Sequence, residues 1–202
     1  MGLLKNIFAT IGFIIVAALI FAFVKFDLGT KMEQVSKLDS QALPAYMDMF
    51  DKVLETGDPA KGMVRRVKMV IPEGMTKKEA FENALEIADE VASEHGLALV
   101  DSKTMPRGGK LFKDGGLLTH IRSYCSPTIA DTFLNHSREF IAFMPCRIGF
   151  IEEPNGDIYI YTMSMELLIN GGRPLSPRLL ELANEVRSGM YEMMDKAAKG
   201  ED

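Results

Sequence analysis

The pattern of apolar and polar residues separates an N-terminal apolar run from a longer, amphipathic remainder. Residues 7–24 read IFATIGFIIVAALIFAFV, and no charged residue falls between Lys5 and Lys25. At a rise of ~1.5 Å per residue, these eighteen residues would span roughly 27 Å as a helix, close to the hydrocarbon thickness of a bilayer. The run predicts one N-terminal transmembrane helix, and we assign residues 1–25 to this anchor.

A cleaved secretory signal peptide is the alternative interpretation of this run, because Lys5 supplies the basic start that a signal peptide needs. The run is longer than the usual apolar core of a signal peptide. The residues at its end, Phe23-Val24-Lys25-Phe26, contain no small-residue cleavage site. We therefore expect an anchor that is retained in the mature protein.

Lysines on the two sides of the run give opposite indications about its orientation. Lys25, Lys31 and Lys37 lie after the run, and this excess of positive charge favours a cytoplasmic domain. A short head with a single lysine is nonetheless the usual form of a signal-anchor that exports the domain C-terminal to it. We expect a single-pass membrane protein whose domain lies on the extracytoplasmic, periplasmic side.

After the anchor, the pattern predicts a connector over residues 26–62 and a folded domain over residues 63–202. Within the connector, residues 44–56 place Met47, Phe50, Val53 and Leu54 on one face of a short amphipathic helix. Such a face needs an apolar partner, which is either the protein's own domain or another subunit. About 140 residues remain for the domain, enough for one compact core.

The domain alternates between strand and helix patterns. We expect strands at residues 66–71, 97–100, 117–125, 140–152 and 157–165, and helices that begin after Thr76, Ser126 and Ser176. Thr76 and Glu79 form a capping box, and Asn155-Gly156 is a strong hairpin signal. An α+β fold, with an antiparallel sheet and helices packed on one face, buries both kinds of apolar stripe.

The strand after this hairpin alternates isoleucine with tyrosine. Ile158 and Ile160 fall on one face, and Tyr159 and Tyr161 fall on the other. We expect helices to cover the isoleucine face. We expect a ligand or a second protomer to cover the tyrosine face.

Charge and composition disfavour some classes of function. Residues 26–202 carry 21 basic and 28 acidic residues, a net charge of −7, which disfavours binding to nucleic acid or to anionic lipid headgroups. Two cysteines allow one disulfide at most, so this is not a disulfide-built domain. The chain has fourteen methionines and no tryptophan. We expect most of the methionines to fill the core, among them Met47, Met69, Met190, Met193 and Met194.

Cys125 and Cys146 are the main candidates for chemistry, because they fall at matching ends of the third and fourth strands. His120, His136 and Met144 lie near them in the sequence. Thiolate, imidazole and thioether groups are soft ligands suited to copper(I), zinc or haem iron, although no C-x-x-C or zinc-finger spacing occurs. Three interpretations stay open: two buried thiols that act as small apolar groups, a disulfide or redox pair, and a metal or haem site.

Three further residues carry weaker indications. His120 shares a strand face with Arg122 and Tyr124, which indicates an exposed or ligand-facing surface. Arg147 is a candidate for holding an anionic ligand or a partner's carboxylate, with a salt bridge at the rim as the simpler interpretation. His136 lies near a helix end, where a positive charge favours the helix dipole, so we expect a structural role.

Several local motifs, in order, resemble the domain of unknown function 302 family over residues 63–195. They are a first helix that ends in Gly96-Leu97, the small-residue-Pro step in Tyr124-Cys125-Ser126-Pro127, Met144-Pro145-Cys146-Arg147 before a hairpin, and Asn155-Gly156-Asp157 in it. The resemblance implies a strongly curved antiparallel sheet, similar to the TATA-binding-protein class of folds, and a tendency to dimerise. It implies no catalytic residue, because the family has no settled activity. The anchor, the connector and the cysteine at the small-residue-Pro step depart from the family's pattern.

The function that these observations favour is a membrane-anchored binding or interaction module with an unknown ligand. We expect an oligomeric accessory subunit of a membrane assembly, with the membrane and either further copies or a larger complex as partners, and no nucleic acid. The alternative is a redox, metal-handling or haem-handling protein that uses Cys125 and Cys146. No catalytic set is recognisable in the sequence, so enzymatic activity stays open and is not favoured, and the cofactor is unknown.

Overall fold

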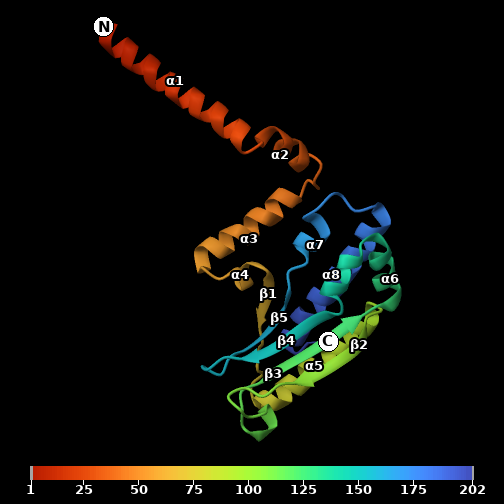
Figure 1. Ribbon diagram of the computed structural model, residues 1–202. Coiled ribbons are helices and arrows are strands. Elements are labelled where there is room, and N and C mark those ends of the chain that lie inside the picture. The colour runs from red at the N-terminus through yellow and green to blue at the C-terminus, as the bar shows by residue number, and fades with distance from the viewer. Residues whose placement is uncertain (1, 202) are drawn as a thin grey trace.

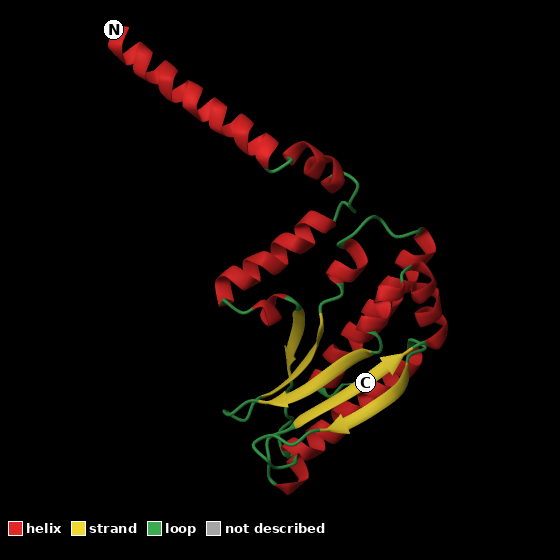
Figure 2. Ribbon diagram, in the orientation of Figure 1, coloured by secondary structure: helices red, strands yellow, loops and turns green. Residues whose placement is uncertain are grey.

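The domain is built on one five-stranded antiparallel sheet. The computed structural model describes residues 2–201, apart from the side chains of residues 3 and 4. The strands are β1 (Val64–Lys68), β2 (Ala98–Thr104), β3 (Thr119–Cys125), β4 (Cys146–Glu152) and β5 (Ile158–Met163), in the sheet order β1-β5-β4-β3-β2. Two long helices, α5 (Lys77–Glu94) and α8 (Pro177–Lys199), pack side by side behind the sheet (Figures 1 and 2). The predicted α+β class, with helices on one face of an antiparallel sheet, is confirmed.

The chain forms eight further helical segments in the described residues, most of them short. They are α1 (Gly2–Lys25), α2 (Leu28–Val35), α3 (Ala42–Thr56), α4 (Pro59–Gly62), η1 (Phe112–Asp114), α6 (Pro127–His136), η2 (Arg138–Phe143) and α7 (Glu166–Asn170). Figure 1 shows α1 extending away from the domain, with α2 and α3 between it and the sheet. Over residues 5–25, α1 is long and apolar enough to span a membrane, and none of this segment is buried against the rest of the chain.

The core lies between the sheet and the pair α5 and α8. It contains the side chains on the inner face of β4 and β5, the alanine-rich side of α5, and methionines of α8. Met69, Met190, Met193 and Met194 are at most 4% exposed, which confirms their predicted role as core filler. Met47 is 48% exposed, so the same prediction is wrong there, because the side of α3 that carries it faces away from the domain.

Local signals in the sequence set several element boundaries. Thr76 caps α5, and its side chain and that of Glu79 form the predicted reciprocal capping box. The β4–β5 hairpin turns at Asn155-Gly156, where Gly156 adopts a φ of +88°, a conformation that glycine takes without steric cost. Ser176 accepts a hydrogen bond from the Leu179 N–H at the start of α8.

The two faces of β5 differ as predicted. Ile158 and Ile160 are fully buried under the helices, whereas Tyr159 and Tyr161 lie half-buried on the opposite, open face of the sheet. Their rings lie 6.3 Å apart, and the Arg66 guanidinium stacks 4.5 Å from the centre of the Tyr159 ring. A ligand or second protomer on this face stays a prediction.

Three predicted elements need correction. The predicted strand over residues 140–152 begins only at Cys146, because Pro145 has no N–H to donate to a ladder and the residues before it form η2. The predicted strand at residues 97–100 extends to Thr104, because β3 supplies its pairing partner. The connector contains α2 as well as the predicted amphipathic helix, since Leu28–Val35 forms a separate helical segment.

Candidate functional site: an apolar cavity lined by both cysteines

An apolar cavity of about 80 Å³ lies where β3 ends and β4 begins, bordered by α6, η2, α7 and α8. Three aromatic side chains and three thioethers form much of its wall: Phe133, Phe140, Phe143, Met144, Met163 and Met165. The rings of Phe133 and Phe140, 5.1 Å apart, hold η2 against α6. The cavity therefore exists because a short helix and a 3-10 helix fold back over the end of the sheet.

Cys125 and Cys146 both line this cavity, one at the end of β3 and the other at the start of β4. Cys146 pairs across the sheet with Tyr124, so Cys125 is its diagonal neighbour. Both cysteines are free thiols in the structure.

The expected neighbourhood of the two cysteines is thus confirmed, while their chemical role stays a prediction. Burial, together with the nearby Cys125, raises the pKa of Cys146 to about 11, and Arg147 offsets only part of that rise. At neutral pH Cys146 is therefore a thiol, which is a poor nucleophile and does not bind metals until it loses its proton. A soft metal ion would have to displace that proton.

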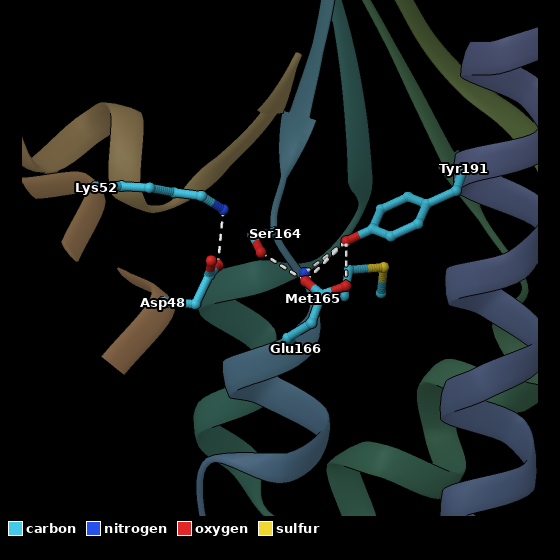
Figure 3. Close-up of polar contacts among 6 residues, drawn as sticks. All are labelled: Asp48, Lys52, Ser164, Met165, Glu166 and Tyr191. Atoms are coloured by element: carbon cyan, nitrogen blue, oxygen red, sulfur yellow. Dashed lines mark hydrogen bonds and ion pairs between the residues drawn. The ribbon is translucent and has the colours of Figure 1, made fainter. Parts of the chain in front are cut away.

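A polar network fixes one wall of the cavity (Figure 3). The Tyr191 hydroxyl of α8 accepts a hydrogen bond from the Met165 N–H (3.1 Å) and donates to Glu166 (2.9 Å to Oε2). Ser164 Oγ donates to the same carboxylate at 2.5 Å. Burial acts to raise the pKa of Glu166, but the hydrogen bonds from Ser164, its own backbone and Tyr191 outweigh it and lower that pKa. The exposed Asp48–Lys52 pair of α3, 2.7 Å long, lies beside this network in Figure 3.

His120 does not lie on a ligand-facing surface, and this prediction is wrong. The strand face that it shares with Arg122 and Tyr124 is covered by α5, so His120 is 6% exposed. Its Nδ1 lies 2.8 Å from Thr104 Oγ1, and its Nε2 lies 3.2 Å from Ser102 Oγ. Burial, with a smaller contribution from Arg122, lowers the pKa of His120. Both ring nitrogens are engaged, so His120 is a satisfied core residue.

The other polar groups on this face bind α5 to the sheet. The Tyr124 hydroxyl donates to Asp89 Oδ1 at 2.8 Å, and Arg122 forms an ion pair with the same carboxylate. Arg122 Nη1 also donates to the Leu85 carbonyl at 2.9 Å. Burial raises the pKa of Tyr124. These contacts are structural, although the Tyr124 side chain also forms part of the cavity wall.

The remaining candidate residues divide between the cavity and the surface. Met144 lies in the cavity with the two cysteines, whereas His120 and His136 are not among its lining residues. His136 ends α6, with its ring 6.5 Å from that of Phe140. Arg147 is exposed on the open face of the sheet, and its backbone lies opposite Ser123 in the β3–β4 register. Over the described residues, no three His, Cys, Asp or Glu side chains gather in a metal-binding group.

Sequence reasoning misses most of the cavity wall. The sequence pattern places Phe140 and Phe143 in a strand, although they lie in η2. Tyr191 does not line the cavity, but its hydroxyl holds the Met165 N–H beside it, and the sequence analysis gives no indication of that role. The sequence does single out Cys125, Met144 and Cys146, which all line the cavity.

An antiparallel sheet with two long helices on one face and a small apolar cavity at one end defines a compact α+β domain. Residues 73–197 match the family called Domain of unknown function DUF302, and the chain belongs to this family. A similar solved structure is the crystal structure of an uncharacterized conserved DUF302 protein from Bacillus stearothermophilus, with 18% identity and a TM-score of 0.49. The match covers 67% of this chain and 98% of that one. No curated protein matches the chain.

Proposed function

We propose that the protein is a single-pass, membrane-anchored binding module whose DUF302 domain takes up a small apolar group in the cysteine-lined cavity. The cavity itself carries the proposal. Beside the buried core, apolar side chains of α6, η2 and α8 border an unfilled space. Apolar cavities stay dry and take up apolar molecules, so this space is suited to a hydrocarbon group.

The volume of the cavity limits the size of that group. Sites for drug-sized ligands occupy ~300–1,000 Å³, and an engineered cavity of ~150 Å³ takes up benzene. A cavity of about 80 Å³ therefore accommodates roughly three or four carbon atoms. The proposed ligand inserts the end of an alkyl or prenyl chain and leaves its larger part outside. Haem is too large for this space and is not part of the proposal.

The membrane part of the proposal rests on α1, whose apolar surface has no partner in the described chain other than neighbouring turns. We place the domain on the periplasmic side, as an accessory subunit in a homo-oligomer or a larger membrane assembly. Protease digestion of sealed vesicles tests the orientation, because a periplasmic domain is digested only from that side. Native mass spectrometry from lipid nanodiscs tests the assembly, and a strictly monomeric protein would contradict it.

The cavity is tested with 1-butanol as the apolar probe and methyl-labelled methionines as reporters. Met144, Met163 and Met165 line the cavity, whereas Met69 and Met193 are buried elsewhere and serve as internal references. Butanol should shift the three cavity methyl signals in the full-length protein and leave the reference signals in place. If the cavity signals do not respond, the cavity does not admit an apolar group.

Two alanine substitutions provide a matched pair for this experiment. Ala130 lines the cavity, whereas Ala142 is exposed in the neighbouring η2. Ala130→Leu fills the space and should abolish the butanol-dependent shifts, while Ala142→Leu should leave them intact. Equal responses in the two variants would place the probe outside the cavity and contradict the proposal.

A soft-metal site is the second candidate function, because Cys125, Cys146 and Met144 border the same cavity. Thiolate and thioether groups are soft ligands that suit copper(I). Anaerobic titration of the full-length protein with copper(I), against a colorimetric chelator as competitor, tests this function. Binding of one ion that is lost in Cys125→Ser and Cys146→Ser supports it, whereas wild-type protein that never competes with the chelator contradicts it.

A further inference from the structure

Two helices of the connector carry apolar side chains that the described part of the chain leaves uncovered. These side chains are 37–68% exposed and lie along one side of each helix: Leu28, Met32 and Val35 on α2, and Leu43, Met47, Phe50 and Leu54 on α3. On α3 they recur at intervals of four, three and four residues, which keeps them on one side of the helix. We call these two sets the α2 stripe and the α3 stripe.

The α3 stripe cannot turn inward, because a different side of α3 already packs on the domain. Ala42 is 1% exposed, and the Tyr46 hydroxyl donates to the Gly171 carbonyl at 3.0 Å. Gly62 of α4 lies so close to α3 that an added Cβ would come 2.9 Å from Val53 Cγ2. The predicted amphipathic helix is therefore apolar on two sides, of which one packs on its own domain and the other has no partner among residues 2–201.

A defined corner separates α2 from the end of α1. Asp27 adopts a φ of +47°, in the left-handed region that aspartate tolerates better than most residues. The Thr30 hydroxyl donates to Asp27 Oδ1 at 2.9 Å, and the Lys31 N–H donates to the Asp27 carbonyl at 3.1 Å. The chain therefore turns between α1 and α2 rather than continuing as one helix (Figure 1).

We propose that the α2 and α3 stripes dock on the surface of the bilayer that α1 spans. This inference rests on the membrane anchor of the proposed function. Only Phe26 and Asp27 separate the last residue of α1 from the first residue of α2. The α2 stripe therefore lies within reach of the lipid surface. The bilayer is then one occupant that covers both stripes. The connector also lies outside the family match at residues 73–197, so α2 and α3, like the anchor, are additions to the matched domain.

The attraction to the bilayer is apolar rather than electrostatic. Residues 26–62 contain four lysines and seven acidic residues, a net charge of −3. Interfacial helices that bind anionic lipids are instead rich in lysine and arginine. Docking should therefore occur on zwitterionic lipid, and it should be insensitive to salt because screening does not weaken apolar contacts.

Single tryptophan reporters test the docking, because the natural chain has no tryptophan. The full-length protein is placed, one chain per disc, in nanodiscs of phosphatidylcholine with or without brominated acyl chains, which quench tryptophan on contact. Phe50→Trp reports the α3 stripe and Met32→Trp the α2 stripe. Asp51→Trp is the matched control on the polar side of α3, and Phe13→Trp reports the anchor. Circular dichroism confirms that each variant is folded.

The proposal predicts blue-shifted emission and loss of intensity in brominated discs for Phe50→Trp, Met32→Trp and Phe13→Trp, and neither change for Asp51→Trp. If bromine quenches the Phe13→Trp reporter but fails to quench either Phe50→Trp or Met32→Trp, the docking is overturned and the anchor is left intact. Unquenched Phe13→Trp overturns the anchor and the docking together. Blue-shifted Phe50→Trp emission that ignores bromine and requires two chains per disc identifies a second copy as the occupant, which also overturns the docking.

Discussion

Removal of the Tyr191 hydroxyl tests whether the polar network supports the cavity wall. Tyr191→Phe deletes one hydrogen bond to the ionised Glu166 and leaves the Met165 N–H without its acceptor. A hydrogen bond to a charged group contributes ~1.5–3 kcal/mol to stability, about twice the contribution of a neutral one. We therefore expect Tyr191→Phe to lower the free energy of unfolding by about 1.5–3 kcal/mol at pH 7.

Tyr46→Phe is the matched control for this substitution. The Tyr46 hydroxyl also makes one hydrogen bond, to the Gly171 carbonyl at 3.0 Å, but its side chain is 43% exposed and water replaces the lost partner. Its removal should cost about 0.5 kcal/mol or less. Urea unfolding followed by circular dichroism measures both variants in the full-length protein. Equal costs for the two variants would refute the idea that the network is a buried support.

The effect of Tyr191→Phe should also depend on pH. The folded state lowers the pKa of Glu166, so the stability that this carboxylate contributes is present above its unfolded pKa of ~4.3 and is lost as the pH falls through the folded value. The difference between wild type and Tyr191→Phe should therefore shrink in acid. Faster hydrogen exchange of the Met165 amide in the variant would locate the change, and unaltered exchange there would contradict the assignment.

Buried groups give three further predictions. Met193→Ala, at a fully buried site, should cost about 2–5 kcal/mol in urea unfolding, and Met75→Ala, at an exposed site, much less. Burial is the main cause that raises the pKa of Cys146, so alkylation of Cys146 by iodoacetamide in Cys125→Ser protein should be slow at neutral pH and should accelerate in alkaline solution. Rapid labelling at pH 7 would contradict its burial. Burial lowers the pKa of His120, so its NMR ring signals should stay those of the neutral form below pH 6.5. The free energy of unfolding should fall as the pH falls below the unfolded pKa of ~6.5, and His120→Gln should remove this pH dependence.

The features predicted correctly from the sequence depend on interactions between residues that are close in the chain. The capping box joins Thr76 to Glu79 across one helical turn, and the Asn155-Gly156 turn places both strands of a hairpin within a few residues. Alternation of Ile158 and Ile160 with the tyrosines likewise results from the two-residue period of a strand. The placement of Cys125 and Cys146 in one neighbourhood could also be predicted, because both lie at strand ends.

The errors share a different cause. Strand alternation places His120, Arg122 and Tyr124 on one face, and this is correct, but it does not reveal that α5 covers that face. Met47 has the spacing of a core residue, yet it lies on the side of α3 that the domain does not use. In each case, a local pattern gives the direction of a side chain along its own element and says nothing about which element lies opposite.

By itself, the sequence determined the apolar segment over residues 7–24, the N-termini of α5 and α8, the β4–β5 turn and the two faces of β5, since adjacent residues supply each of these signals. The tertiary structure alone decided that η2 and α6 close a cavity over Cys125 and Cys146, that His120 is buried, and that one side of α3 has no partner in the described chain. These features depend on contacts between segments far apart in the chain, and the free energy of such contacts is set by which surfaces the folded topology brings together.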